Sequence, residues 1–66
     1  MKFYKHEEQI VSLENVTEVC IISGDTIRII YTHFDRNGNN YVNWINAKDS
    51  KEAKQILEDI YNALNA

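Results

Sequence analysis

The sequence contains one cysteine, no proline and only two glycines. A single cysteine excludes an internal disulfide and a cysteine-rich zinc site, two of the devices that usually stabilise very small domains. No apolar run approaches the ~20 residues of a membrane helix, and the first eight residues lack a signal-peptide core. We therefore expect a cytoplasmic protein with no membrane partner. Eight asparagines and nine isoleucines are typical of a low-GC bacterium or its phage.

Positive charge is also scarce. Seven lysines and arginines stand against ten aspartates and glutamates, so the net charge is −3. The positive residues are scattered along the chain, whereas affinity for phosphate backbones depends on clustered lysine and arginine. A nucleic-acid partner is therefore not expected.

The chain is too short for two domains, and we expect one small α+β domain over residues 1–66. A domain of about 60 residues buries only about 60% of the surface of its unfolded chain, so its core is marginal. With a disulfide and a zinc cluster excluded, association with a partner is the remaining way to gain stability.

The clearest local pattern lies at the C-terminal end. Asp49 and Glu52 have the spacing of a capping box, with a short acceptor at the N-cap and a glutamate three residues later. An apolar stripe at helical spacing follows, made of Ala53, Ile56, Leu57, Ile60 and Leu64. The pattern predicts a helix from Ser50 to about Leu64.

The two glycines punctuate three β-rich runs, residues 17–22, 26–34 and 41–47. A two-residue loop at Gly24-Asp25 would pair Ile22 with Ile27, and one at Asn37-Gly38 would pair Phe34 with Tyr41. We expect the N-terminal residues to add a further strand. The predicted fold is α+β: an antiparallel meander of three to four strands with one C-terminal amphipathic helix on one face.

This register distributes the apolar side chains over both faces of the sheet, because successive residues of a strand point to opposite sides. The face expected under the helix carries Cys20, Ile22, Ile27, Ile29, Tyr31, Val42 and Trp44. The opposite face carries Val19, Ile21, Ile30, Phe34, Tyr41 and Ile45, diluted by polar residues that include Arg28. One helix covers one face, and a large exposed apolar patch normally marks an interaction surface.

No pattern of catalytic or metal-binding residues emerges. Cys20 and His33 are the only thiol–imidazole pair, and the predicted register places them about 13 Å apart. The two histidines lack zinc-site spacing, and a hairpin turn explains the residues around Gly38 better than a calcium loop does. We therefore expect neither an enzyme nor a bound metal or cofactor.

The favoured function is a non-enzymatic protein-interaction module, for example a small regulatory or inhibitor protein of a bacterium or phage, that forms a homodimer through the helix-free face. Another protein is the second candidate partner. The candidate binding residues are Phe34, Tyr41, Ile30, Ile45, Val19, Ile21, Arg28 and Arg36. The alternative is a small-ligand or nucleotide site at a subunit junction. There a base would stack on Phe34 and Tyr41, with an arginine near its phosphate.

Overall fold

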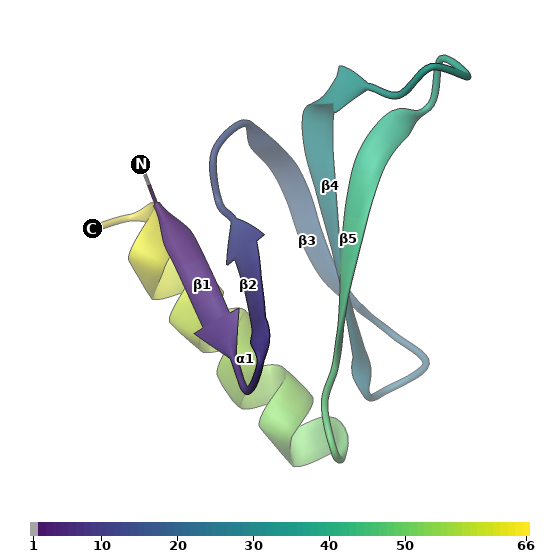
Figure 1. The fold of residues 1–66 in the computed structure, drawn as a ribbon. Coiled ribbons are helices and arrows are strands. Elements are labelled where there is room, and N and C mark those ends of the chain that lie inside the picture. Colours follow the sequence, from purple (N-terminus) through teal and green to yellow (C-terminus); the bar gives the residue numbers. More distant parts are fainter. Residues whose placement is uncertain (1) are drawn as a thin grey trace.

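The computed structural model describes residues 2–66 and shows five antiparallel strands in two sheets, followed by one helix (Figure 1). The elements are β1 (Phe3–His6), β2 (Gln9–Ser12), β3 (Val16–Ile22), β4 (Thr26–Phe34), β5 (Asn40–Asn46) and α1 (Ser50–Leu64). The α+β class and the meander β3-β4-β5 are confirmed. The N-terminal segment forms a separate hairpin, β1-β2, and so contributes two strands where one was expected. No helix among residues 2–66 has the length and apolar character needed to cross a bilayer.

Helix α1 has the predicted bounds, Ser50–Leu64. The Asp49 side chain caps it by accepting a hydrogen bond from the backbone N–H of Glu52 at 2.8 Å. The carboxylate of Glu52 reaches back to the backbone N–H of Lys48 at 3.0 Å, one residue before the N-cap. The first bond satisfies a donor that the first turn of a helix leaves without a partner, and the second holds the residue before the cap against the helix.

The loop between β3 and β4 has three residues, and the two-residue loop predicted at Gly24-Asp25 is wrong. Ser23 and Gly24 both adopt positive φ, and Ile22 pairs with Thr26. Ser23, which a two-residue loop would leave in the strand, therefore takes a left-handed position in the loop. The pairing moves by one residue, so that Cys20 lies opposite Arg28.

The loop between β4 and β5 is also longer than predicted and spans residues 35–39. The Asp35 carboxylate accepts hydrogen bonds from the backbone N–H groups of Asn37 and Asn39, which stabilises a wider turn than a two-residue Asn-Gly loop. Phe34 consequently pairs with Asn40 and not with Tyr41.

These two corrections exchange residues between the faces of the sheet. Val19, Ile21 and Ile45 now share a face with Ile27 and Ile29, and Ile45 is fully buried. The opposite face carries Cys20, Ile22, Arg28, Ile30, Val42 and Trp44. A shift of one residue has this effect because side chains alternate along a strand.

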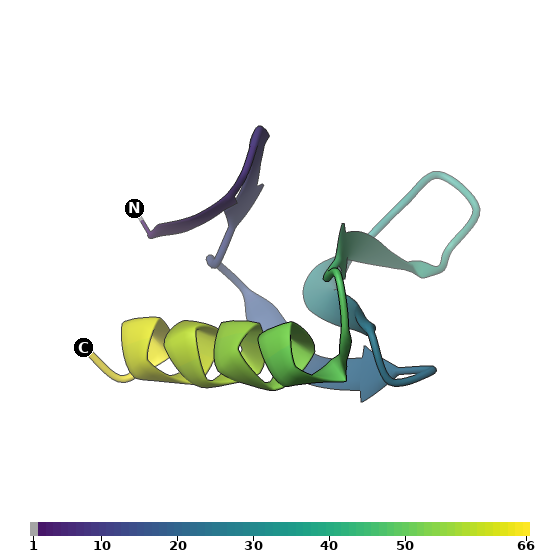
Figure 2. The ribbon, with the colours of Figure 1, turned by 90° about the horizontal axis from the view of Figure 1, so that it is seen from below.

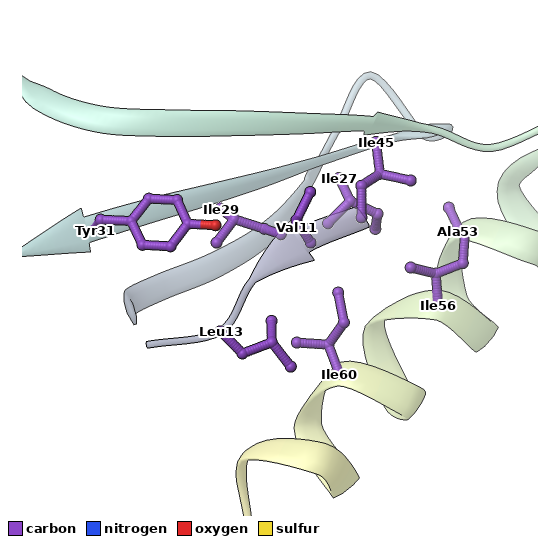
Figure 3. Packing of buried hydrophobic residues seen from close by; sticks show 9 residues of the cluster. All are labelled: Val11, Leu13, Ile27, Ile29, Tyr31, Ile45, Ala53, Ile56 and Ile60. Carbon is purple, nitrogen blue, oxygen red and sulfur yellow. The ribbon is translucent and has the colours of Figure 1, made fainter. Parts of the chain in front are cut away.

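The hairpin β1-β2 and helix α1 both cover the same face of the three-stranded sheet (Figures 1 and 2). Figure 3 shows Val11 of β2 close to Ile29 of the sheet, and Leu13, which follows β2, beside Ile60 of α1. The buried core is Val11, Leu13, Ile27, Ile29, Tyr31, Ile45, Ala53, Ile56 and Ile60. One side of the sheet thus has two covering elements, and the other side has none among residues 2–66.

Polar contacts hold β1 along the helix. The Lys2 ammonium donates hydrogen bonds to the backbone oxygens of Ala63 and Ala66, each at 3.1 Å. At the other end of the strand, the His6 imidazole lies 3.4 Å from the carboxylate of Glu52. Glu52 therefore joins the helix cap to the hairpin.

Glu52 should make the stability of the fold depend on acidity. The backbone N–H of Lys48 holds the pKa of the Glu52 carboxyl below its usual value, and His6 adds to this effect. A lowered pKa in the folded state contributes stability above the unfolded pKa, and this contribution is lost as the pH falls through the folded pKa. We therefore expect the urea denaturation midpoint of Glu52→Gln to fall less than that of the natural chain when the pH is lowered from neutral into the acid range. Glu58→Gln, at an exposed position of the same helix, is the control. An unchanged acid-side slope in Glu52→Gln would contradict this assignment.

Candidate functional site

The candidate site is the uncovered face of the three-stranded sheet. We call it the open face and define it by Cys20, Ile22, Arg28, Ile30, Val42 and Trp44. These residues lie at alternate positions of β3, β4 and β5, so the sheet itself positions them side by side. Four of the six are apolar or aromatic, one is a thiol and one is a cation.

Trp44 is the largest side chain of the open face. It lies on the edge strand β5, opposite Arg28, and keeps 49% of its surface exposed. The other members of the face are only partly buried. A tryptophan beside aliphatic neighbours on a flat surface is the composition found at the centre of protein interfaces.

Arg28 occupies the central strand and gives the open face its positive charge. One guanidinium nitrogen, Nη2, lies 3.9 Å from the carboxylate of Glu18 on β3. The Nε atom is buried and has no hydrogen-bond partner among residues 2–66. A buried N–H donor without an acceptor is costly to the stability of the fold.

The structure does not gather the eight predicted binding residues into one surface. Arg28 and Ile30 lie on the open face. Ile45 is a core residue, and Val19 and Ile21 pack against the core, so these three cannot line an exposed patch. Phe34, Tyr41 and Arg36 are exposed at the far end of the β4-β5 hairpin.

Trp44, Val42, Ile22 and Cys20 belong to the site, although the sequence pattern had assigned them to the core under the helix. The available signal was Ser23-Gly24, a pair that can hold two successive left-handed residues and lengthen the loop by one. A three-residue loop at these positions gives β3 its observed register.

The structure keeps Cys20 and His33 apart. Cys20 belongs to the open face, while the His33 ring lies 5.6 Å from that of the core residue Tyr31, so thiol and imidazole do not meet. Within residues 2–66, no three histidine, cysteine or acidic side chains come together in a way that could hold a metal ion.

Searches of protein-family models, curated proteins and solved structures found no match to this chain.

Proposed function

We propose that this chain is a non-enzymatic protein-interaction module that self-associates through the open face. The observation that carries the proposal is the position of the hairpin and the helix on the same side of the sheet. The other side consequently retains an apolar surface with Trp44 half exposed. Surfaces of this kind normally mark sites of association.

A second copy of the chain is the partner that suits this surface. Two sheets pack face to face at about 10 Å with their apolar side chains interdigitated, and a two-fold pair uses the same patch on both copies. The polar residues of the patch are also self-complementary. Arg28 and Glu18 carry opposite charges close together, so Arg28 of one copy can meet Glu18 of the other. Such a contact would form a second ion pair to the guanidinium group, across the interface.

The size of the surface indicates the strength of association. Three strands spaced about 4.8 Å apart and about seven residues long form a plane of about 14 by 23 Å, or about 330 Å² per copy. Two such planes fall below the ~1,200 Å² of a standard stable interface. We therefore expect a dimer with a dissociation constant in the micromolar range.

The test replaces Trp44 with glutamate. Placing a charge at the largest apolar side chain of the proposed interface should weaken dimerisation about 30-fold or more. Sedimentation equilibrium at micromolar concentration measures this change directly. Trp44 is also the only tryptophan, so its emission should shift to shorter wavelength as the natural chain associates.

Tyr61→Glu is the matched control, because Tyr61 is an exposed aromatic residue on helix α1, outside the open face. This variant should dimerise like the natural chain, and circular dichroism should show that both variants remain folded. A natural chain that stays a 7.7 kDa monomer at micromolar concentration would refute the proposal, as would a Trp44→Glu variant that still dimerises.

The nucleotide-binding alternative has less support. It requires Phe34, Tyr41 and two arginines around one ligand, but Arg28 belongs to the open face and the Tyr41 ring contacts His33. Arg36 lies in the exposed loop between β4 and β5. The four residues therefore do not converge on one site.

A further inference from the structure

Strands β2 and β5 approach each other without pairing. β2 belongs to the two-stranded sheet and β5 is an edge strand of the three-stranded sheet, and the two run in opposite directions (Figure 1). At one end, the side-chain amide of Gln9 on β2 donates a hydrogen bond to the Trp44 carbonyl on β5 at 2.7 Å. At the other end, Ser12 of β2 and Tyr41 of β5 line one pocket of about 290 Å³. We call the space between residues 9–12 and 41–44 the strand gap.

The backbone of β5 presents unpaired hydrogen-bonding groups to the strand gap. Ala47, which follows β5, donates its backbone N–H to the Asp25 carbonyl at 2.9 Å, and this bond marks a hydrogen-bonded position of the β4-β5 ladder. Because such positions alternate along an antiparallel pair, Trp44 and Val42 direct their backbone groups away from β4. Gln9 occupies the Trp44 carbonyl. The N–H of Trp44 and both backbone groups of Val42 have no partner among residues 2–66.

The edge of β2 presents groups of the same kind. Leu13, which follows β2, donates its backbone N–H to the Lys2 carbonyl at 2.9 Å. The same alternation therefore directs the backbone groups of Ser12 and Ile10 away from β1. The Ser12 carbonyl accepts a hydrogen bond from the Tyr31 hydroxyl. The N–H of Ser12 and both backbone groups of Ile10 have no partner within the described chain. Unpaired edges of this kind are templates for a further strand.

The Gln9 bridge limits the width of the strand gap. A glutamine side chain of four bonds reaches about 5 Å from its Cα atom, and a carbonyl oxygen lies about 2.4 Å from the Cα atom of its residue. With the hydrogen bond of 2.7 Å, the two backbones are at most about 10 Å apart at this point. Neighbouring strands lie about 4.8 Å apart, so a strand placed between two others needs about 9.6 Å. This limit leaves room for one inserted strand and no more.

An inserted strand would also find side-chain neighbours on both of its faces. On the side away from the core, Ile10 and Trp44 flank the strand gap and keep 64% and 49% of their surfaces exposed. On the side of the core, the pocket is lined by Tyr41 and His33, whose rings lie 4.8 Å apart. Because side chains alternate along a strand, one set would pack between Ile10 and Trp44 and the other would enter the pocket.

The occupant of the strand gap must be a segment with both of its edges free. Each strand within residues 2–66 already pairs with another strand along at least one edge. A second copy of the described chain therefore has no free strand to insert. An extended segment of a different protein meets this requirement, because its backbone groups are unpaired on both sides before it binds.

We propose that the strand gap binds an extended peptide segment of another protein, which adds a strand between β2 and β5. Backbone hydrogen bonds to both edges supply the affinity, and a backbone N–H of the segment replaces Gln9 at the Trp44 carbonyl. The segment pairs antiparallel with one edge and parallel with the other, because the two edges run in opposite directions. The apolar flanks favour an uncharged segment rich in β-branched residues. This site consists of strand edges and does not require the proposed dimer.

The test is an NMR titration of the full-length, isotope-labelled chain with a capped five-residue peptide of alternating threonine and valine. The N–H signals that face the strand gap should move downfield and gain protection from hydrogen exchange, namely those of Ile10, Ser12, Val42 and Trp44. Lys5 is the internal control, because it pairs with Ile10 and its backbone groups face the outer edge of β1. Shifts confined to other residues, or no shift at millimolar peptide, would overturn the proposal.

A methylated peptide is the matched ligand. Methyl groups on the backbone nitrogens of both valines leave the side chains in place and remove the N–H groups that face one edge, because alternate residues point to the same side. This peptide should bind about 10-fold or more weakly, since each lost hydrogen bond contributes about 1 kcal/mol. Equal affinity of the two peptides would show that the backbone is not recognised and would refute strand addition.

A proline variant removes one donor from the protein. Val42→Pro deletes an N–H that faces the strand gap and takes no part in the β4-β5 ladder, a position that proline can occupy in an edge strand. The variant should bind the unmethylated peptide about 5-fold more weakly. Val42→Ala keeps the N–H and should bind like the natural chain. Unchanged affinity in Val42→Pro would contradict the proposed pairing, and the methylated peptide decides the question if this variant does not fold.

Ile30→Glu separates this proposal from the proposed dimer. Ile30 belongs to the open face and lies on the central strand β4, away from both edges of the strand gap. The variant should dimerise less and still bind the peptide. Loss of both would show that the peptide binds the open face, which would refute the strand gap as its site. A chain that dimerises but binds no peptide would leave only the dimer standing. Protection of the N–H groups in the gap that rises with protein concentration, without peptide, would identify a second copy as the occupant and overturn the proposal.

Discussion

Replacing Ile45 with alanine should destabilise the fold by about 2–5 kcal/mol. The side chain is fully buried against the core isoleucines of β4, and truncating a buried isoleucine removes apolar burial and leaves a cavity. Because small domains have little stability in reserve, this variant should be largely unfolded at room temperature. Urea denaturation followed by circular dichroism measures the effect. Ile45→Val, with an expected loss of about 0.5–1.5 kcal/mol, gives a measurable value if the alanine variant does not fold.

Ile30→Ala is the matched control for the register. The sequence pattern predicts Ile30 and Ile45 on the same face of the sheet, which would make the two truncations similar in effect. In the structure Ile30 pairs with Val42 on the open face, so its truncation should cost much less than that of Ile45. The comparison requires concentrations at which the chain is monomeric, because Ile30 belongs to the proposed interface. Equal losses at the two positions would show that the observed register is wrong.

Leu13→Ala should cause the second large loss, again about 2–5 kcal/mol. Leu13 follows strand β2, is 4% exposed and points toward Ile60 of the helix (Figure 3). Leu13 connects the N-terminal hairpin to the rest of the core, so its truncation should destabilise the packing of both the hairpin and the helix. Urea denaturation reports the total effect, and amide hydrogen exchange should show that β1 and β2 lose protection together with the helix.

Ile10→Ala is the corresponding control in the hairpin, because Ile10 is 64% exposed. Its substitution should change the free energy of unfolding by less than about 0.5 kcal/mol. If Leu13→Ala released only the hairpin and left helix protection unchanged, β1-β2 would be an appendage and not part of the core.

Helix α1 was predictable to the residue because its signals are local. The cap at Asp49 and the apolar residues from Ala53 onward act within one or two turns, and their geometry does not depend on distant parts of the chain. The class of the fold and the order of the meander were also predictable, since both glycines do lie in the turns.

The register was not predictable in the same way. The local sequence is compatible with Ser23 in the loop or in the strand, yet this choice decides on which face Cys20 and Ile22 lie. The carboxylate of Asp35 similarly widens the second turn through two backbone hydrogen bonds. The candidate site differs from the prediction as a result. Trp44, expected in the core, lies on the open face, and Ile45, expected on the exposed face, lies in the core.

Composition and local patterns by themselves determined that the protein has no internal disulfide, that it ends in an amphipathic helix, and that its sheet carries apolar residues on both faces. The tertiary structure alone decided which residues occupy each face and which face stays uncovered. The physical reason is the two-residue period of a strand, which leaves the content of a face undecided until long-range packing selects the register. The apolar side chains of the hairpin pack on the same side of the sheet as the helix. The other side, around Trp44, is therefore left as the open face.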